Sequence, residues 1–377
     1  MITWITPWLA SLWQPLQALE YITVRIGLAA TFAFLSALLL GRPVINALRR
    51  AGVWENSSSN DDPEIAALHK ARGKSETPTM GGVFWVTAIL VSTLVFANPG
   101  ELLVLLGAIL LVGMGTLGFF DDWIKWKREG NRNGLSRSTK MFATVLLAGY
   151  VATMLWLMGE RTGRPDIGHI YFPLIKDLVA NTGDVAWISL GVFVVFESFV
   201  ILATSHAANV TDGLDGLAAG SGLIAFCALT VATYAAGHAG LAEYLHIPFI
   251  PGAGEVAVMG GAVLGATLGF LWFNSYPAEV FMGDSGSLPM GAMIGYLAIV
   301  SKQELALPLL AGVYVLDVST SLLQIYWFKL TGKRLFRKAP IHHAFELRGI
   351  HEAKIVSRFW IGGAISAALG LLLIKLR

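Results

Sequence analysis

The sequence predicts an all-α, polytopic membrane protein, and its composition and apolar runs carry that prediction. Of the 377 residues, 55% are hydrophobic and only 14% are charged, whereas a soluble domain usually has about 25% charged residues. The apolar residues also gather into long runs, and a helix needs roughly 20 such residues to cross a bilayer. The formal net charge of +2 gives no reason to expect a nucleic-acid partner.

Ten apolar runs recur along the chain, so about ten transmembrane helices are expected in a single integral-membrane catalytic domain, residues 1–377. The runs are approximately Ile22–Leu40, Met80–Ala97, Leu102–Phe120, Met141–Met158, Val185–Thr204, Leu217–Ala236, Val256–Phe273, Leu288–Val300, Ala306–Phe328 and Phe359–Ile374. The eighth run is short and contains glycine. The sole cysteine, Cys227, excludes an intrachain disulfide. Small residues in several runs would permit a homodimer.

The distribution of Lys and Arg predicts which side of the membrane each loop faces. The loops after the first, third and ninth runs carry 20 of the 27 Lys and Arg residues, and cytoplasmic loops retain an excess of positive charge. Both termini are therefore expected on the periplasmic side. The same assignment puts the polar motifs on the cytoplasmic face, where we expect the active site.

Three acidic clusters lie at the ends of apolar runs. Asp121 and Asp122 follow the third run, Asp212 and Asp215 precede the sixth, and Asp284 precedes the eighth. Carboxylates are costly inside a bilayer, so such groups are functional candidates by default. Hard oxygen ligands without nearby cysteine suit Mg²⁺ or Mn²⁺. The three clusters together predict one shared cation site.

Basic residues and glycines near these carboxylates indicate the substrate class. Lysines at 74, 125, 127 and 140 flank the acidic clusters, as a polyanionic substrate would require. Gly213 and Gly216 would let backbone amides approach a phosphate or a flat ring. Metal and lysines together point to phosphate chemistry.

Each motif also has a purely structural interpretation. The Asp121–Asp122 pair could be a solvated helix end, and Asp212 or Asp215 could cap the sixth helix. Asn274 could belong to a simple turn. The pair His342–His343 could be part of a positively charged loop. The agreement of all these motifs on one membrane face favours a common site over separate structural roles.

Six motifs occur in the order seen in a known enzyme family. They are Thr77–Gly82, Gly118–Asp122, Asn209–Gly216, Phe270–Asn274, Phe281–Ser287 and Ala339–His343. In these motifs the chain resembles the phospho-N-acetylmuramoyl-pentapeptide transferase family, from about residue 20 to the C-terminus. That family belongs to the polyprenyl-phosphate N-acetylhexosamine-1-phosphate transferases, which are membrane enzymes of ten helices with a cytoplasmic Mg²⁺ site.

The resemblance implies a reaction in the bacterial cytoplasmic membrane. Phospho-N-acetylmuramoyl-pentapeptide would pass from its UDP-linked form to undecaprenyl phosphate, giving lipid I and UMP in the first membrane step of peptidoglycan synthesis. It implies catalytic roles for Asp121, Asp122 and Asp284, with Asp284 and Asp212 as metal ligands. The residues implied in substrate binding are Lys74, Thr77, Lys140, Asn209, Asp212, Gly213, Leu214, Asp215, Asn274, Phe281, Gln324, His342 and His343.

Two positions depart from the family pattern, and two other functions stay open. His206 replaces an asparagine that the family has before the Thr-Asp-Gly segment, and Ala344 replaces the third of three histidines. An N-acetylglucosamine-1-phosphate transferase would share the metal site but differ in the last cytoplasmic loop. A cation-coupled transporter would need its carboxylates deeper in the bundle.

Overall fold

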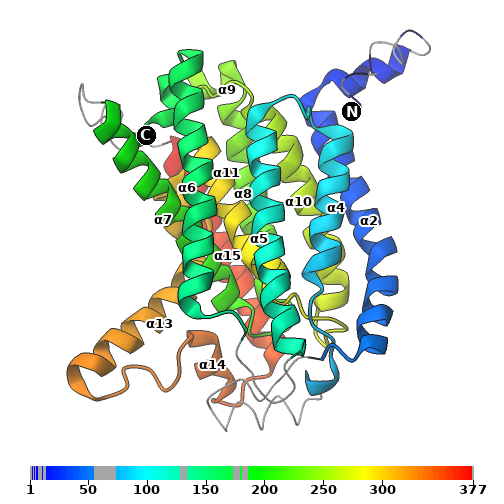
Figure 1. Ribbon diagram of the computed structural model, residues 1–377, viewed down its shortest axis with the longest axis vertical. Helices are drawn as coiled ribbons and strands as arrows, with labels where there is room; N and C mark the ends of the chain where they lie inside the picture. The colour runs from blue at the N-terminus through cyan, green and yellow to red at the C-terminus, as the bar shows by residue number, and fades with distance from the viewer. Residues whose placement is uncertain are drawn as a thin grey trace.

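The computed structural model describes residues 14–54, 74–127, 134–172, 179–180 and 186–375, with a few separate positions before residue 14. Within these ranges the protein is a bundle of long helices (Figure 1), as the sequence predicts. The long helices are α2 (Ile22–Ala51), α4 (Gly82–Phe96), α5 (Leu102–Lys127), α6 (Arg137–Thr162), α7 (Ala186–Thr211), α8 (Leu217–Ala236), α10 (Ala253–Asn274), α11 (Asp284–Ser301), α13 (Gly312–Thr331) and α15 (Glu352–Lys375).

Shorter elements connect these helices. They are η1 (Gln14–Glu20), η3 (Lys74–Glu76), η4 (Pro165–Gly168), α9 (Ala239–Leu245), η5 (Glu304–Ala306), α12 (Leu307–Leu310) and α14 (Ile341–Glu346). Within the described ranges the one sheet is formed by β1 (Ile170–Tyr171), which pairs antiparallel with β2 (Val179–Ala180).

Nine of the ten apolar runs each lie on one long helix, and the ninth run covers η5, α12 and α13. Not all of these helices qualify as membrane spans. Among the described residues, seven helices are long and apolar enough to cross a bilayer, and the bent pair of η5–α12 with α13 would make eight. Helix α4 is apolar but shorter. The multi-pass architecture is thus confirmed, whereas the count of ten spans stays a prediction.

Helix α11 is the core of the bundle, because every one of its residues is buried. It packs against α4, α5, α7 and α8. Glycines make the close packing with α7 possible, since a Cβ atom at Gly291 would lie only 2.1 Å from the carbonyl oxygen of Thr204. The eighth run therefore contains glycine because α11 packs closely against other helices and not against lipid.

The expected continuous ninth helix is broken in the structure. Helix α13 turns by 91° from the η5–α12 segment, and Figure 1 shows it extending away from the bundle. At the break, Ala311 leaves the helical conformation. The hydroxyl of Ser366 on α15 donates to the carbonyl of Leu309 at 2.8 Å, so a backbone acceptor near the break is satisfied by a side chain.

The bundle has two distinct ends. We call the end that carries α14, the C-terminus of α5 and the N-terminus of α11 the acidic end. The start of α2 and the end of α15 lie at the opposite end (Figure 1). This agrees with the expectation that the termini share one side, while the assignment of that side to the periplasm stays a prediction. The expected cytoplasmic loops include 55–73 and 128–133, which lie outside the described residues.

Gly118 offers a test of how α5 meets α11. A Cβ atom there would lie 1.9 Å from the backbone oxygen of Asp284, so Gly118→Ala should force the two helices apart and cost about 1–3 kcal/mol. Thermal unfolding in detergent would measure the loss. Gly27→Ala is the matched control, because no atom lies within 4 Å of its added methyl. Equal unfolding midpoints for the two variants would contradict this contact.

Candidate active site

Three carboxylates meet where the end of α5 reaches the first residue of α11. Oxygens of Asp121, Asp122 and Asp284 lie within 4.8 Å of one another, and all three residues are buried. Among the described residues this is the one group of such side chains with metal-site geometry. Two of the three predicted acidic clusters, 162 residues apart in sequence, thus converge. Asp212 is not in this group, so its role as a metal ligand stays a prediction.

Asp122 holds the first turn of α11 in place. Its two carboxylate oxygens accept hydrogen bonds from the backbone N–H groups of Asp284 at 3.2 Å and Ser285 at 2.9 Å. The residue before this turn is Gly283, with a φ of +69°, a conformation that favours glycine. Asp122 therefore acts as a helix cap from a neighbouring helix, which suits the positive end of the α11 dipole.

Two lysines neutralise the other two carboxylates. The ammonium of Lys125 lies 2.6 Å from Asp121 Oδ2 and 3.2 Å from Asp284 Oδ2. Lys140, in the first turn of α6, lies 3.0 Å from Asp121 Oδ2 and 2.8 Å from Asp284 Oδ2. Asp121 also accepts from the backbone N–H of Leu135 at 2.7 Å. These two cations offset the repulsion between two buried carboxylates that lie this close together.

Asn209 joins the cluster from α7. Its amide donates to Asp284 Oδ1 at 2.7 Å and to the Ser287 hydroxyl at 2.9 Å. Because Lys125 and Lys140 occupy Oδ2, both oxygens of Asp284 have fixed partners. The side chain is oriented by three helices before any ligand arrives.

Lys74 lies apart from the acidic cluster, in a second group of charges. Its ammonium contacts Glu352 Oε1 at 2.6 Å and Asp215 Oδ1 at 2.8 Å, and all three side chains are buried. It also lies 5.8 Å from the centroid of the Phe281 ring. Burial alone would lower the pKa of Lys74, but Glu352 and Asp215 outweigh it and raise the pKa above its usual value. Lys74 therefore stays charged.

Asn274 braces the loops around this second group. Its amide donates to the carbonyl of Val280 at 2.9 Å, and its oxygen accepts from the N–H of Gly216 at 3.1 Å. Asp215 Oδ2 accepts from the N–H of Ala278 at 3.0 Å. The turn before α8 and the loop before Phe281 are thereby fixed to each other. The two hydrogen bonds of the Asn274 side chain explain why this residue is buried and not exposed in a turn.

The two histidines of α14 each pair with a carboxylate. His342 Nδ1 lies 2.8 Å from Asp317 Oδ2 on α13, and His343 Nδ1 lies 2.7 Å from Glu346 Oε2. A Cβ atom at Gly213 would lie 2.6 Å from His342 Nε2. The histidine motif therefore packs directly against the 209–216 motif, which requires glycine at this position.

The remaining predicted residues have varied surroundings. Gln324 accepts from the N–H groups of Leu335 and Phe336, at 3.0 and 2.9 Å, and so fixes the loop after α13. The N–H of Thr77 donates to the carbonyl of Lys74 at 3.2 Å. Leu214 is buried in a small apolar cluster with residues of α13 and α15. Asp212 and Ala344 are placed beside these motifs, partly and fully buried respectively.

Sequence reasoning missed the acidic partners of the basic residues. Glu352, Asp317 and Glu346 were not among the candidates, yet each is almost fully buried and paired. The signal was weak, because each is a single acid among the basic residues of the last expected loop or within an apolar run. Only a search for carboxylates at the starts of helices would have selected Glu352.

Comparison with known proteins agrees with this geometry. Residues 102–302, from α5 to the end of α11, match the model of glycosyl transferase family 4. The chain is 42% identical over 364 residues to a phospho-N-acetylmuramoyl-pentapeptide-transferase of Thermodesulfovibrio yellowstonii, covering 96% of each chain. The chain belongs to the phospho-N-acetylmuramoyl-pentapeptide transferase family. As a member of this transferase family it carries all three acidic motifs inside the matched region, while Lys74, His342 and His343 lie outside it.

Substitution of single aspartates by asparagine tests how much each carboxylate contributes to the turnover of this transferase. Asp121→Asn, Asp212→Asn and Asp284→Asn should each lower kcat by about two orders of magnitude or more, the scale of acid–base and electrostatic contributions. Turnover of folded, purified variants would measure this. Asp61→Asn, outside the described residues in a Ser- and Asn-rich stretch, should retain wild-type turnover. A wild-type kcat in the Asp284 variant would refute its assignment as a ligand.

Proposed function

We propose that this protein transfers phospho-N-acetylmuramoyl-pentapeptide from its UDP-linked form to undecaprenyl phosphate, giving lipid I and UMP. The observation that carries the proposal is the buried group of Asp121, Asp122 and Asp284 with Lys125 and Lys140. It combines hard metal ligands with cations for phosphate in a member of the transferase family. The name of the relative, which shares 42% identity, supports this substrate pair.

The carboxylate group fits a divalent metal. Three buried carboxylates offer hard oxygen atoms within 4.8 Å, and such ligands suit Mg²⁺ or Mn²⁺ better than softer metals. Asp284 would be the main ligand, with support from Asp122, and we propose Asp212 as a further ligand. When bound, the cation would neutralise charge on the pyrophosphate of the nucleotide sugar.

The reaction forms one P–O bond and breaks another. An oxygen of the lipid phosphate attacks the β-phosphorus of the nucleotide sugar, and the bond from that phosphorus to the oxygen of UMP breaks. Asp121 orients the lipid phosphate and takes its proton if one is present. Lys125 and Lys140, which touch both Asp121 and Asp284, stabilise the charge that develops on the departing UMP.

The second group of charges supports a nucleoside pocket. Phe281 is partly exposed, so its ring is available to stack on uracil. Lys74, Asp215 and the 213–216 turn lie beside it. Asn274 positions this pocket through the two loops that it joins. His342 and His343 would then face the sugar-peptide end, with Gln324 fixing the adjoining loop.

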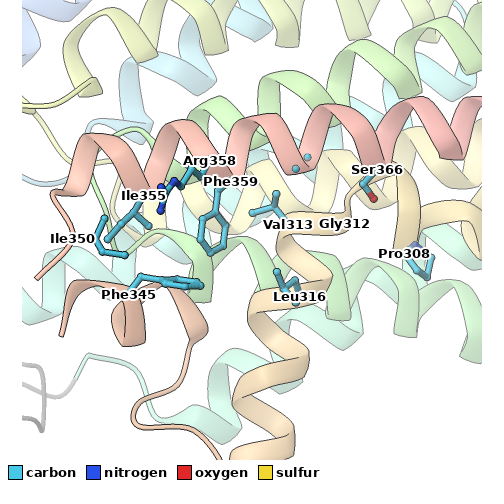
Figure 2. Close-up of a pocket in the computed structure, with 12 residues that line it drawn as sticks. Pro308, Gly312, Val313, Leu316, Phe345, Ile350, Ile355, Arg358, Phe359 and Ser366 are labelled. Atoms are coloured by element: carbon cyan, nitrogen blue, oxygen red, sulfur yellow. The ribbon is translucent and has the colours of Figure 1, made fainter. Parts of the chain in front are cut away.

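An apolar pocket of about 470 Å³ between α13 and α15 suits the polyprenyl chain. Figure 2 shows its lining running along α15 from Ile350 and Phe345 at one end to Ser366 and Pro308 at the other. Arg358 is the one charged residue in that lining. The pocket adjoins α14, so an isoprenoid lying in it would keep its phosphate near the acidic end.

The remaining assignments follow from this function. The protein acts in the bacterial cytoplasmic membrane, with ten spans, its termini outside and its active site on the cytoplasmic face. The excess of Lys and Arg in the loops after the first, third and ninth apolar runs supports this orientation. Exposed apolar residues on α2, such as Leu35 and Leu39, would allow a second copy to pack there.

The substrate assignment is tested by direct assay. Purified protein with undecaprenyl phosphate and Mg²⁺ should release UMP from UDP-N-acetylmuramoyl-pentapeptide and scarcely any from UDP-N-acetylglucosamine. The basic surface of residues 329–358 suits the carboxylates of the peptide. Excess chelator should abolish release, and added Mg²⁺ should restore it, because the pyrophosphate charge needs a divalent cation.

Two results of the same assay would contradict this assignment. A preference for UDP-N-acetylglucosamine would make the protein an N-acetylglucosamine-1-phosphate transferase with the same metal mechanism. Full UMP release in excess chelator would refute the metal site itself.

Filling the apolar pocket tests the lipid site. Gly362 lines the pocket, and a Cβ atom there would meet nothing within 4 Å. Gly362→Phe should therefore fold normally while it occupies the pocket, and raise the KM for undecaprenyl phosphate about tenfold with the KM for the nucleotide sugar unchanged. Gly191→Phe, which also has open space but lies outside the lining, is the control. An unchanged lipid KM in the Gly362 variant would place the chain elsewhere.

A further inference from the structure

The first residue of the last helix reaches the nucleotide end of the site. Glu352 is completely buried at the start of α15. Its Oε1 accepts from the Lys74 ammonium at 2.6 Å and from the backbone N–H of Asp215 at 2.8 Å. These partners are 278 and 137 residues away in sequence. One carboxylate therefore ties together three segments that no local structure would connect.

Helix α15 also holds the same turn at a second point. The indole N–H of Trp360 donates to the carbonyl of Gly216 at 3.2 Å. Gly216 adopts a φ of +77°, so this turn needs external support. An apolar cluster reinforces the contact, with Leu214 and Leu217 of the turn packed among Val313, Ile355, Val356 and Phe359. The helix thus binds the turn by a charge, an N–H group and apolar packing.

The charge arrangement favours this position for a glutamate. The carboxylate lies at the N-terminus of its own helix, where the dipole stabilises negative charge. Lys74 is left between two carboxylates, Asp215 and Glu352, and it lies 5.8 Å from the centroid of the Phe281 ring. Glu352 therefore fixes where the only cation of this group can lie. Because two carboxylates already neutralise the Lys74 ammonium, this lysine is better suited to orienting the neighbouring residues than to binding a phosphate.

We propose that Glu352 is a positioning residue for nucleotide recognition. It fixes Lys74 and the 213–216 turn beside Phe281, and it acts through them without touching substrate. This assignment rests on the proposed function, because it names Lys74 and Phe281 as the nucleoside pocket. It gives the C-terminal helix a role in the affinity for the nucleotide sugar.

Glu352→Gln separates positioning from packing. The amide keeps the size of the side chain and an oxygen for the Asp215 N–H, but it removes the charge that holds Lys74. Because hydrogen bonds to charged groups are the stronger ones, the KM for the nucleotide sugar should rise about tenfold. The dissociation constant of UMP, measured by calorimetry on the intact detergent-solubilised protein, should rise equally. The KM for undecaprenyl phosphate should stay constant, and kcat should change less than about threefold.

Two comparisons exclude a general effect on stability. Glu279→Gln, an exposed glutamate in the loop before Phe281, should leave all of these constants unchanged. Lys74→Gln should raise the nucleotide KM, and adding Glu352→Gln to it should raise the KM little further, because the glutamate acts through Lys74. Additive effects of the two changes would contradict that route.

The outcomes distinguish this inference from the proposed function. If wild-type protein releases no UMP from the nucleotide sugar, the proposed function fails. If the wild-type protein is active, and the folded Glu352→Gln variant binds UMP and the nucleotide sugar as tightly as the wild-type protein does, the positioning role is wrong. If that variant does not fold, Glu352→Asp decides, since its shorter carboxylate cannot keep both partners and should raise the nucleotide KM about threefold. Wild-type constants in the folded Asp variant would overturn the inference.

Discussion

Burial of like charges at the contact of α5 with α11 is the constraint on which the rest of the site depends. Asp121, Asp122 and Asp284 lie within 4.8 Å of one another, and such a group is stable only where cations and N–H donors face it. Lys125 and Lys140 supply the cations, and the first turn of α11 supplies N–H groups to Asp122. The helices must therefore approach closely. That requirement makes glycine necessary at Gly118, where a Cβ atom would lie 1.9 Å from the backbone oxygen of Asp284, and at Gly283, where it would lie 2.6 Å from Asp122 Oδ2.

Helix α11 converts this local constraint into the architecture of the bundle. It is buried along its whole length, so the other helices surround it and bring their polar ends to its N-terminus. Asn209 arrives on α7, Lys140 on α6 and the two aspartates on α5. A buried helix can carry glycine, serine and an ionised residue, because neighbouring helices satisfy them instead of lipid. Because α11 is buried among other helices, its composition is less apolar than that of a typical lipid-facing span.

The candidate site consists of two separate groups of charged residues. The acidic cluster lies inside the part of the chain that matches the glycosyl transferase family 4 model, residues 102–302. The Lys74 group draws on residues on both sides of it, namely Lys74 before and Glu352 after. In the function that we propose, the chemistry takes place at the cluster inside the matched region, and recognition of the nucleotide involves the C-terminal helix through Glu352. The apolar pocket that we propose for the polyprenyl chain also lies along α15.

The sequence by itself determined the membrane class, the positions of the helices and the meeting of Asp121 and Asp122 with Asp284, whereas the third acidic motif, Asp212 and Asp215, is not part of that group. These follow from local properties: apolar run length, and carboxylates that a bilayer excludes unless they share a site. Only the tertiary structure decided that Lys74 pairs with Asp215 and Glu352 and not with the acidic cluster. It also decided that His342 pairs with Asp317 and that the ninth run bends by 91°. Those outcomes depend on which residues from distant segments meet in the bundle. A charged side chain in a low-dielectric interior pairs with its nearest opposite charge in space, and spacing along the chain does not specify that neighbour.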